Sequence, residues 1–281
     1  MKIAVLGMGR MGQAFAGRLL DQGHELTVWN RTPGKAAELE REGAVEASSA
    51  RDAVAGVEMA VTLLGDDQAV RDVAWGDEGI RSALPDGSVY VDCSTISPPL
   101  SDELDDAFPR FVAMPVLGSP SQVAAGQAMY LIGAREAVAA AVAPLFPGLS
   151  EKTFRYHRPS MASAAKVAVN LLLLDGVVAL AESFAVGRAG GLSDDQLREL
   201  LADSPMVAPG LEYRFEGVLT GEQEPIWTTV LGAKDAGLAV ELAKTAGVDL
   251  PLTGTARDLY REAAAGEEHA DIAAVTRRYS R

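Results

Sequence analysis

Three polar residues on one predicted helix have the chemistry and the spacing that proton transfer to a substrate requires. Ser163, Lys166 and Asn170 are separated by three and four positions, so they share one face of an otherwise apolar helix. A carbonyl group that receives a hydride develops negative charge on its oxygen and needs a proton from a positioned acid. A lysine removed from water beside a cationic ring has its pKa lowered towards neutrality, which suits this role. Lys166 is therefore a candidate catalytic acid/base, and Asn170 is a candidate substrate ligand.

A purely structural explanation fits the same residues. A lysine near the start of a helix can lie along apolar surface with its ammonium group in water. Asn170 can be hydrogen-bonded inside the protein core. The three residues alone leave both explanations open.

A glycine-rich turn near the start of the chain indicates a dinucleotide site. The apolar run 3–6 predicts a buried strand, and the residues after the turn carry apolar side chains at helical spacing. Gly7 permits a tight turn, Gly9 lets a pyrophosphate approach the backbone, and Gly12 lets the helix pack on the strand. The N–H groups and the positive end of the helix dipole then hold the phosphates. The expected cofactor contacts in this turn are Gly7, Met8, Gly9, Arg10, Met11 and Gly12.

The residues after the second predicted strand, 25–29, bear on the choice of cofactor. NAD sites usually have Asp or Glu there to accept the ribose hydroxyls, and this chain has Asn30-Arg31-Thr32. Asn30 does not repel a 2′-phosphate, and Arg31 can grip one with its planar fork of donors. Thr32 and Lys35 are close enough to add a hydroxyl and a positive charge. The pattern favours NADP over NAD, although a solvated turn has a similar composition.

Two further strand ends supply candidate contacts. The strand expected over 58–64 makes Leu63, Leu64 and Gly65 candidate neighbours of the nicotinamide half of the dinucleotide. The strand over 88–92 leads into Ser94 and Thr95, whose hydroxyls could bind a carboxylate, or could simply form a turn before a helix. Caps are expected at Asp66 or Asp67 and at Ser97, and residues 193–196 form a capping-box pattern.

The order of elements predicts an α/β fold with two domains. Strands alternate with helices over the first 157 residues, further strands being expected at 111–116, 128–132 and 152–156 and a helix at 135–146, which is typical of a doubly wound parallel Rossmann sheet. Every later stretch has a helical pattern: 160–189, 194–202, 226–246 and 252–264. We therefore expect an NADP-binding domain over 1–158 and an all-helical domain over 159–281, joined by a long interdomain helix. That helix is apolar nearly all round, so we expect burial on several sides, a second subunit being the better partner.

Composition narrows the class of protein. The chain has 281 residues, 48% of them apolar, a net charge of −14 and one cysteine, Cys93. The acidic charge argues against nucleic acid, and the lone cysteine with no signal segment before the first strand favours the cytoplasm. The longest apolar stretch, around 167–178, is interrupted by Asn170 and Asp175, so we expect a buried helix and no membrane span. The three scattered histidines do not suggest a metal site.

Four motifs in order resemble the β-hydroxyacid dehydrogenases, which include 3-hydroxyisobutyrate dehydrogenase and the glyoxylate/succinic semialdehyde reductases. They are the glycine-rich turn, residues 92–98, Lys166 with Asn170, and Lys234 with Asp235, and the resemblance covers the whole chain. It implies hydride transfer between NADP(H) and a small aldehyde, keto acid or 3-hydroxyacid, with Lys166 as acid/base. It also implies Ser94, Thr95 and Asn170 at the substrate, Lys234 near the cofactor, and a homodimer or homotetramer built on the helical domain. From the residues alone, a surface charge pair is the better explanation of Lys234 and Asp235.

One departure from the family pattern leaves the substrate open. The substrate loop is Pro115-Val116-Leu117-Gly118-Ser119, in which Leu117 replaces the family's usual serine. We expect Gly118 and Ser119 to contact substrate. Imine reductase activity on the same fold is an alternative, although imine reductases usually have Asp or Tyr in place of Lys166. A non-catalytic NADP-binding protein is a second alternative, and 6-phosphogluconate dehydrogenase is disfavoured because its helical domain is larger.

Overall fold

The computed structural model describes residues 1–279, which form two compact units, Met1–Lys166 and a second unit that begins at Val167. The division falls inside helix α8 (Pro159–Ala189), whose first residue follows the predicted domain boundary at 158/159. Residues 280 and 281 of the predicted second domain lie outside the described residues.

The first unit is built on a nine-stranded sheet, with strands in the order β3-β2-β1-β4-β5-β6-β8-β7 and with β9 paired to β8. Strands β1 to β6 are parallel to one another, and β9 is parallel to β8. The chain order reverses between β1 and β4, and ligands bind at the carboxyl ends of the strands beside such a switch point. The strands are β1 (Lys2–Leu6), β2 (Glu25–Trp29), β3 (Val45–Glu46), β4 (Met59–Thr62), β5 (Val89–Asp92), β6 (Phe111–Ala113), β7 (Val116–Leu117), β8 (Ala128–Gly133) and β9 (Ser150–Tyr156).

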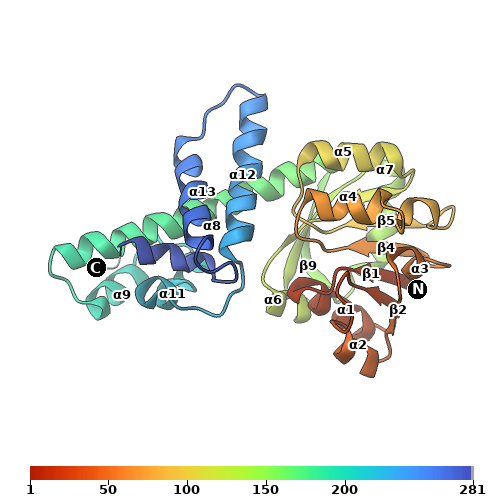
Figure 1. Cartoon of the computed structure of the whole chain (residues 1–281), viewed down its shortest axis with the longest axis horizontal. Helices are drawn as coiled ribbons and strands as arrows, with labels where there is room; N and C mark the ends of the chain where they lie inside the picture. Colours follow the sequence, from red (N-terminus) through yellow and green to blue (C-terminus); the bar gives the residue numbers. More distant parts are fainter. Residues whose placement is uncertain (280–281) are drawn as a thin grey trace. The chain divides into compact units, whose positions relative to one another are not determined.

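Alternate residues of the central strands enter two separate cores, one on each face of the sheet. In β1, Ile3 and Val5 pack in one core, and Ala4 and Leu6 pack in the other. Burial on both faces explains why these strands are apolar throughout. Figure 1 shows α4 and α5 on one side of the sheet and α1 and α2 on the other. The helices of this unit are α1 (Arg10–Asp21), α2 (Ala37–Arg41), α3 (Ala50–Ala53), α4 (Asp67–Trp75), α5 (Pro98–Ala107), α6 (Pro120–Ala124) and α7 (Glu136–Ala139), with 3-10 turns η1 (Ile80–Ser82) and η2 (Ala140–Leu145).

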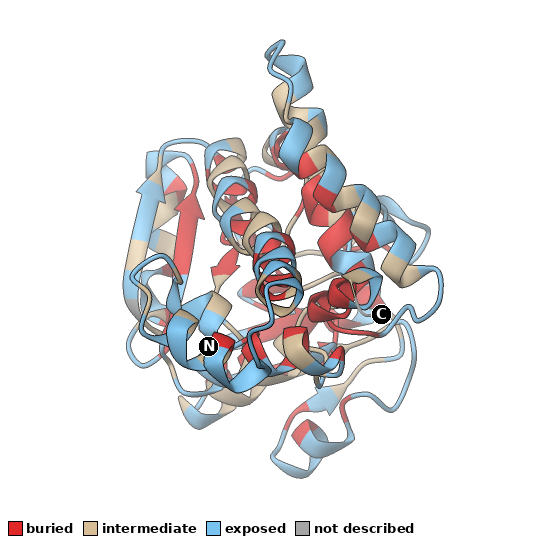
Figure 2. Cartoon of the chain, turned by 90° about the vertical axis from the view of Figure 1, so that its left-hand side faces the viewer, coloured by how far each residue is buried: buried red, intermediate tan, exposed pale blue. Residues whose placement is uncertain are grey.

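The second unit is helical and packs around the C-terminal part of α8. Its core includes Leu174 and Phe184 of α8, Phe215 of α11 and Tyr260 of α13. Buried and exposed residues alternate along individual helices, as amphipathic packing requires (Figure 2). The other elements are α9 (Asp194–Ala202), α10 (Pro209–Glu212), α11 (Phe215–Thr220), α12 (Thr229–Thr245), α13 (Pro251–Ala264) and the 3-10 segment η3 (Ile272–Tyr279).

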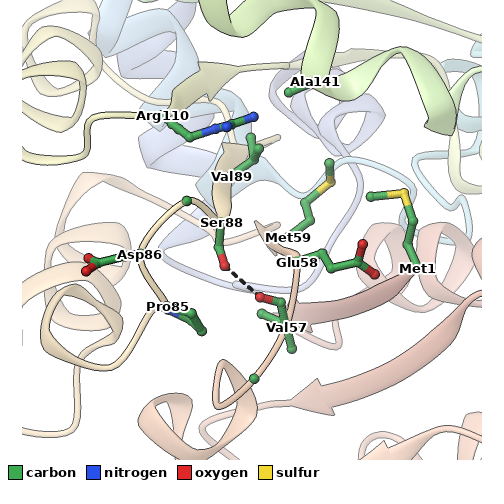
Figure 3. Close-up of a pocket in the computed structure, with 12 residues that line it drawn as sticks. Met1, Val57, Glu58, Met59, Pro85, Asp86, Ser88, Val89, Arg110 and Ala141 are labelled. Carbon is green, nitrogen blue, oxygen red and sulfur yellow. Dashed lines mark hydrogen bonds between the residues drawn. The ribbon is translucent and has the colours of Figure 1, made fainter.

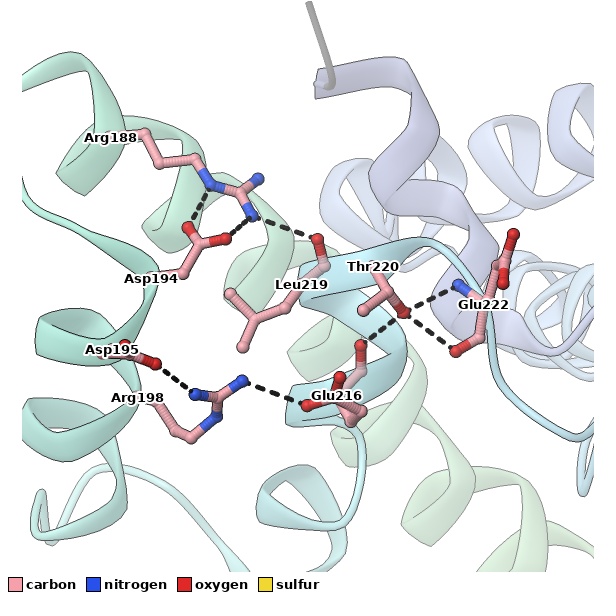
Figure 4. A network of polar contacts seen from close by, with 8 residues as sticks. All are labelled: Arg188, Asp194, Asp195, Arg198, Glu216, Leu219, Thr220 and Glu222. Carbon is pink, nitrogen blue, oxygen red and sulfur yellow. Dashed lines mark hydrogen bonds and ion pairs between the residues drawn. The ribbon is translucent and has the colours of Figure 1, made fainter.

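Charged side chains tie the end of α8 to α9 and α11. Arg188 pairs with Asp194 at 2.7 Å and also donates to the Leu219 carbonyl at 3.1 Å. Arg198 bridges Asp195 at 2.7 Å and Glu216 at 3.1 Å (Figure 4). These pairs are partly exposed, so each contributes little alone, and their value lies in joining three elements.

The structure corrects several details of the predicted elements. The sheet is mixed, since β8 runs antiparallel to β6 and β7. The strand expected over 111–116 is split into β6 and β7 at Pro115, which has no N–H to donate. The helix expected over 135–146 is the short α7 followed by η2, and the helix expected from 226 begins at Thr229, where Thr228 caps it. The short elements α6, α10, α11 and η3 lack the length that gives a clear periodic signal.

Helix α8 is less buried in the single chain than its composition predicts. By length and apolar composition it could span a membrane, a test that core helices of soluble proteins also pass. Leu172 and Val186 are 78% and 72% exposed, with Ala179 midway between them and also exposed. The seven-residue spacing of these three residues gives an apolar stripe on one side of the helix.

Candidate functional site

The glycine-rich turn lies at the switch point of the sheet. Gly7 has φ +106°, and a Cβ atom there would lie 2.9 Å from Leu64 Cδ2 and collide with the Leu63 carbonyl oxygen. A Cβ atom at Gly12 would collide with the Gly7 carbonyl oxygen. By contrast, no described atom lies within 4 Å of the corresponding position at Gly9, so the backbone is open on that side. This pattern fits the roles expected in a dinucleotide-binding turn: a tight turn at Gly7, an open approach at Gly9 and close packing at Gly12.

The start of α1 suits an anion. Gly9 is the N-cap and offers no side-chain hydrogen bond, and the first turn holds no acidic residue. Met8 is buried, Met11 is half-buried and Arg10 is exposed on this turn. Backbone N–H groups at a helix N-terminus carry partial positive charge, which matches the need of a pyrophosphate.

Asn30 has a local task that explains its presence in place of an acid. Its Oδ1 accepts from the Met8 N–H at 2.9 Å, and its Nδ2 donates to the Thr32 carbonyl at 2.9 Å. The side chain thus fixes the glycine-rich turn to the loop after β2. Arg31, Thr32 and Lys35 are all exposed on that loop, where an anion can reach them.

The turns after β4 and β5 are linked through Ser94. The Ser94 hydroxyl donates to Asp92 Oδ1 at 2.7 Å and accepts from the Leu64 N–H at 2.9 Å. Its one hydroxyl proton is therefore already used in a hydrogen bond, and the residue is only 4% exposed. Thr95, Leu63 and Leu64 are half-buried beside it, and Gly65 is exposed. The structure brings these predicted residues together at the carboxyl edge, with Thr95 the more accessible of the two hydroxyls.

Asp92 completes this cluster and was not among the predicted site residues. Thr62 donates to its Oδ1 at 2.7 Å, beside the bond from Ser94. Burial raises the pKa of the Asp92 carboxyl to about 6, although the hydrogen bonds from Thr62 and Ser94 act in the opposite direction. The available signal was an acidic residue at the end of an otherwise apolar strand, a position where polar side chains meet at the sheet edge.

The predicted substrate loop is shaped by a helix cap. Ser119 is the N-cap of α6 and forms a capping box with Gln122, each side chain bonding the other's backbone N–H. Gly118 has φ +152°, and a Cβ atom there would lie 3.2 Å from Ala128. Local structure therefore explains both residues, and Leu117 is half-buried beside them.

Lys166 extends from a part of α8 that is fixed to the first unit. Three residues earlier, the buried Ser163 hydroxyl lies 2.6 Å from the hydroxyl of Ser101, which belongs to the first turn of α5. Gly133 of β8 lets the helix approach, since a Cβ there would lie 2.7 Å from the Ala162 Cβ. The lysine side chain is half-buried.

Asn170 and Lys234 meet at Asp235 in the second unit. Asn170 donates from Nδ2 to Asp235 Oδ2 at 2.9 Å, and Lys234 Nζ lies 2.6 Å from Asp235 Oδ1. Asn170 and Asp235 are buried, while the Lys234 side chain is 21% exposed. One carboxylate therefore orients an amide and an ammonium group, a link between α8 and α12 that spacing along the sequence does not reveal.

A hollow of about 480 Å³ lies at the opposite edge of the sheet, by the amino ends of β1, β4 and β5. Its lining includes Met1, Glu58 and Arg110, and Ser88 donates to the Val57 carbonyl across it at 2.6 Å (Figure 3). Ligands of parallel sheets bind at the carboxyl edge, so this hollow is not the candidate site. Among residues 1–279, no group of three or more His, Cys, Asp or Glu side chains is arranged to hold a metal ion.

Comparison with known proteins agrees with this geometry. Residues 2–157 match the NAD binding domain of 6-phosphogluconate dehydrogenase, and residues 161–279 match the NAD-binding domain of NADP-dependent 3-hydroxyisobutyrate dehydrogenase. The chain belongs to the β-hydroxyacid dehydrogenase family. Members of this family are nicotinamide-dependent oxidoreductases acting on hydroxyl or carbonyl groups, and this chain is one of them.

Individual relatives support the same assignment. The chain is 38% identical over 269 residues to the uncharacterized oxidoreductase YfjR of Bacillus subtilis, covering 92% of each chain. It is 27% identical over 267 residues to glyoxylate/succinic semialdehyde reductase 1 of Arabidopsis thaliana, covering 94% of this chain and 92% of that one. The structure of 3-hydroxyisobutyrate dehydrogenase from Salmonella typhimurium superposes with a TM-score of 0.90 at 25% identity, covering 99% of both chains. An imine reductase from Myxococcus stipitatus shares the fold, with a TM-score of 0.68, 21% identity and 99% coverage of both chains.

Proposed function

We propose that this β-hydroxyacid dehydrogenase transfers a hydride between NADP(H) and a small aldehyde, keto acid or 3-hydroxyacid, with Lys166 as the acid/base. The observation that carries the proposal is the attachment of α8 to the switch-point edge of the first unit. Ser101 lies in the first turn of α5, whose N-cap Ser97 follows the Thr95 turn. Its bond to Ser163 holds the helix turn that precedes Lys166 at this edge.

The proposed chemistry needs one proton for each hydride. The bound nicotinamide cofactor supplies the hydride to the carbonyl carbon. Lys166 gives a proton from its ammonium group to the carbonyl oxygen, which produces an alcohol and a neutral amine, and the reverse reaction returns that proton. Asn170 lies one turn further along the same face of α8. The oxygen of its side-chain amide, Oδ1, can accept from a substrate hydroxyl while Nδ2 donates to Asp235.

The remaining predicted residues have supporting tasks in this proposal. The glycine-rich turn and the start of α1 bind the pyrophosphate, and Leu63 to Gly65 border the nicotinamide half. Thr95 contacts substrate or nicotinamide, and Gly118 and Ser119 border the substrate. Lys234 lies near the cofactor in the family to which the chain belongs, and its ion pair with Asp235 orients the ammonium group. Ser94 acts mainly as a link between the turns after β4 and β5, because its hydroxyl donates its hydrogen bond to Asp92.

NADP preference in this proposal depends on the loop after β2. Arg31, Thr32 and Lys35 are exposed there, and Asn30 occupies the position where an acid would repel the 2′-phosphate. The protein assembles as a homodimer or homotetramer through its helical domain, and it acts in the cytoplasm without nucleic acid or membrane partners. The exposed apolar stripe of α8 supports the assembly, since such stripes are normally covered.

A panel of carbonyl substrates tests the proposal. Purified protein is given NADPH carrying deuterium at the transferable position, with glyoxylate and succinic semialdehyde first in the panel. We expect NADPH oxidation and deuterium on the carbinol carbon of the product. Oxidation of NADPH only with a cyclic imine would instead support the imine reductase alternative, since an imine reductase has the same fold. Tight NADPH binding without turnover of any substrate would support a non-catalytic binder.

A further inference from the structure

A buried carboxylate lies beneath the edge of the sheet where the two turns meet. Asp92 is 1% exposed, and its Oδ1 accepts two hydrogen bonds of 2.7 Å, from Thr62 and Ser94. Thr62 and Asp92 are register partners at the ends of β4 and β5, so the cluster joins the strands at their last residues. Within the described chain, Oδ2 is buried and has no hydrogen-bond partner.

The bond from Ser94 to Asp92 determines what else the hydroxyl can do. A serine hydroxyl has one proton and can accept through its lone pairs. With the proton given to Asp92, the oxygen is available to the Leu64 N–H, which it accepts at 2.9 Å. Without an acceptor at position 92, the Ser94 hydroxyl proton has lost its buried hydrogen-bond partner. The hydroxyl is then no longer held in the orientation in which its oxygen accepts from the Leu64 N–H.

The same two turns are tied a second time, further from the sheet. The Ser97 N–H donates to Asp67 Oδ1 at 2.9 Å, and the Ser97 hydroxyl donates to Asp67 Oδ2. On the other side, Leu64 Cδ2 lies against Gly7, where it leaves no room for a Cβ atom. Displacement of Leu64 would therefore reach the glycine-rich turn directly.

We propose that Asp92 is a positioning residue that acts through Ser94, holding the turns after β4 and β5 at a fixed spacing beside the glycine-rich turn. Its burial leaves the Asp92 side chain almost no surface on which to touch a cofactor or substrate. That the turns border the nicotinamide half of the dinucleotide rests on the proposed function. The coupling of Asp92 to Leu64 through Ser94 is a property of the protein without ligands.

Hydrogen exchange at the Leu64 amide tests the coupling, with NADPH affinity measured by fluorescence titration of the same variants. Asp92→Ala and Ser94→Ala should each raise exchange in the segment 63–66 about tenfold, the effect of losing one buried hydrogen bond. NADPH affinity should fall by a similar factor. The double variant should be no worse than either single variant, because both act on one link.

Matched variants separate positioning from general stability. Thr62→Val removes the other donor to the same carboxylate oxygen but leaves Ser94 in place, so it should lower the melting temperature without raising exchange at Leu64. Asp92→Asn keeps an acceptor and should preserve the protection of Leu64. If Asp92→Ala does not fold, Asp92→Ser replaces it, since its hydroxyl is one atom shorter than the carboxyl group and does not reach Ser94.

The outcomes for the two proposals are distinct. Wild-type exchange at Leu64 in Asp92→Ala or its substitute, or additive effects in the double variant, would overturn the positioning role and leave the enzyme assignment intact. Failure of the wild-type protein to bind NADPH would overturn the proposed function, while the exchange measurements would still decide the role of Asp92.

Discussion

At the scale of single residues, Arg31 offers the sharpest test of cofactor choice. We expect Arg31→Asp to weaken NADPH binding at least about tenfold, because it replaces a charge-assisted contact to the 2′-phosphate with repulsion. NADH binding should change little. Isothermal titration with both cofactors measures this, and Arg41→Asp on the exposed side of α2 serves as the control. Equal losses for the two cofactors would make Arg31 an ordinary surface residue.

Asp92 gives a prediction about stability and pH. Its pKa is about 6 in the folded protein, above the ordinary value of 3.8, so the folded state binds the proton more tightly. Its contribution to stability is greatest below pH 3.8 and is lost as the pH rises through 6. Two pKa units correspond to at most about 3 kcal/mol.

Asp92→Asn removes this titration. Its free energy of unfolding relative to the wild-type protein should therefore rise between pH 4 and pH 7, by up to about 3 kcal/mol. Urea denaturation of both proteins across this range measures the difference. A difference that stays constant with pH would show that Asp92 is not the titrating group.

Local chemistry determined which residues could be predicted. The glycine-rich turn, the Ser97 cap and the Ser193 capping box all depend on neighbours within a few positions, and the structure contains each of them. Leu64, which donates to Ser94, and Asp235, which accepts from Asn170, lie 30 and 65 positions away from these residues. Those partners follow from the folding of the chain, so the sequence could suggest the residues but not how they are oriented.

At the scale of elements, long periodic segments could be predicted and short ones could not. Helix α13 is long enough to show a helical period, and α8 and β1 are recognisable as continuous apolar runs. The 3-10 segment η3 is ordered by tertiary contacts instead. Asp271, just before it, forms a buried ion pair with Arg214 and accepts the N–H groups of Ile226 and Trp227. Such a linkage has no local sequence signal.

Two glycines in contrasting surroundings test the packing of α8. Gly133→Ala should lower the free energy of unfolding by about 1–3 kcal/mol, because the new methyl group lies 2.7 Å from Ala162 and close to the backbone of Arg158. Gly254→Ala, inside α13 with no atom within 4 Å of the new Cβ, should raise it by up to about 1 kcal/mol. Denaturant titrations compare the two. A neutral Gly133→Ala would mean that α8 does not need the close approach.

At the scale of the whole molecule, the apolar stripe of α8 predicts assembly. Leu172 and Val186 are largely exposed in the single chain, and we expect a second copy to cover them. Leu172→Asp should shift the protein towards monomer in analytical ultracentrifugation, whereas Glu199→Lys, at an exposed position of α9, serves as a charge-changing control. A wild-type protein that is monomeric at micromolar concentration would contradict this expectation.

The family and the class of reaction could be inferred because four separated motifs occur in order along the chain, and both family matches confirm that inference. The substrate could not be inferred in the same way. Substrate choice depends on the shape around Leu117 and Thr95, and the identity of neighbouring side chains along the sequence does not give that shape.

In the proposed reaction, one lysine on α8 supplies the proton while the first unit binds the dinucleotide. The test is single-turnover oxidation of NADPH by the carbonyl substrate that the panel identifies, with Lys166→Met compared to Lys152→Met as the control and NADPH affinity measured in parallel. We expect Lys166→Met to oxidise NADPH at least about 100-fold more slowly than the wild-type protein and to bind NADPH with a dissociation constant within about threefold of the wild-type value. A Lys166→Met protein that oxidises NADPH as fast as the wild-type protein would contradict the claim.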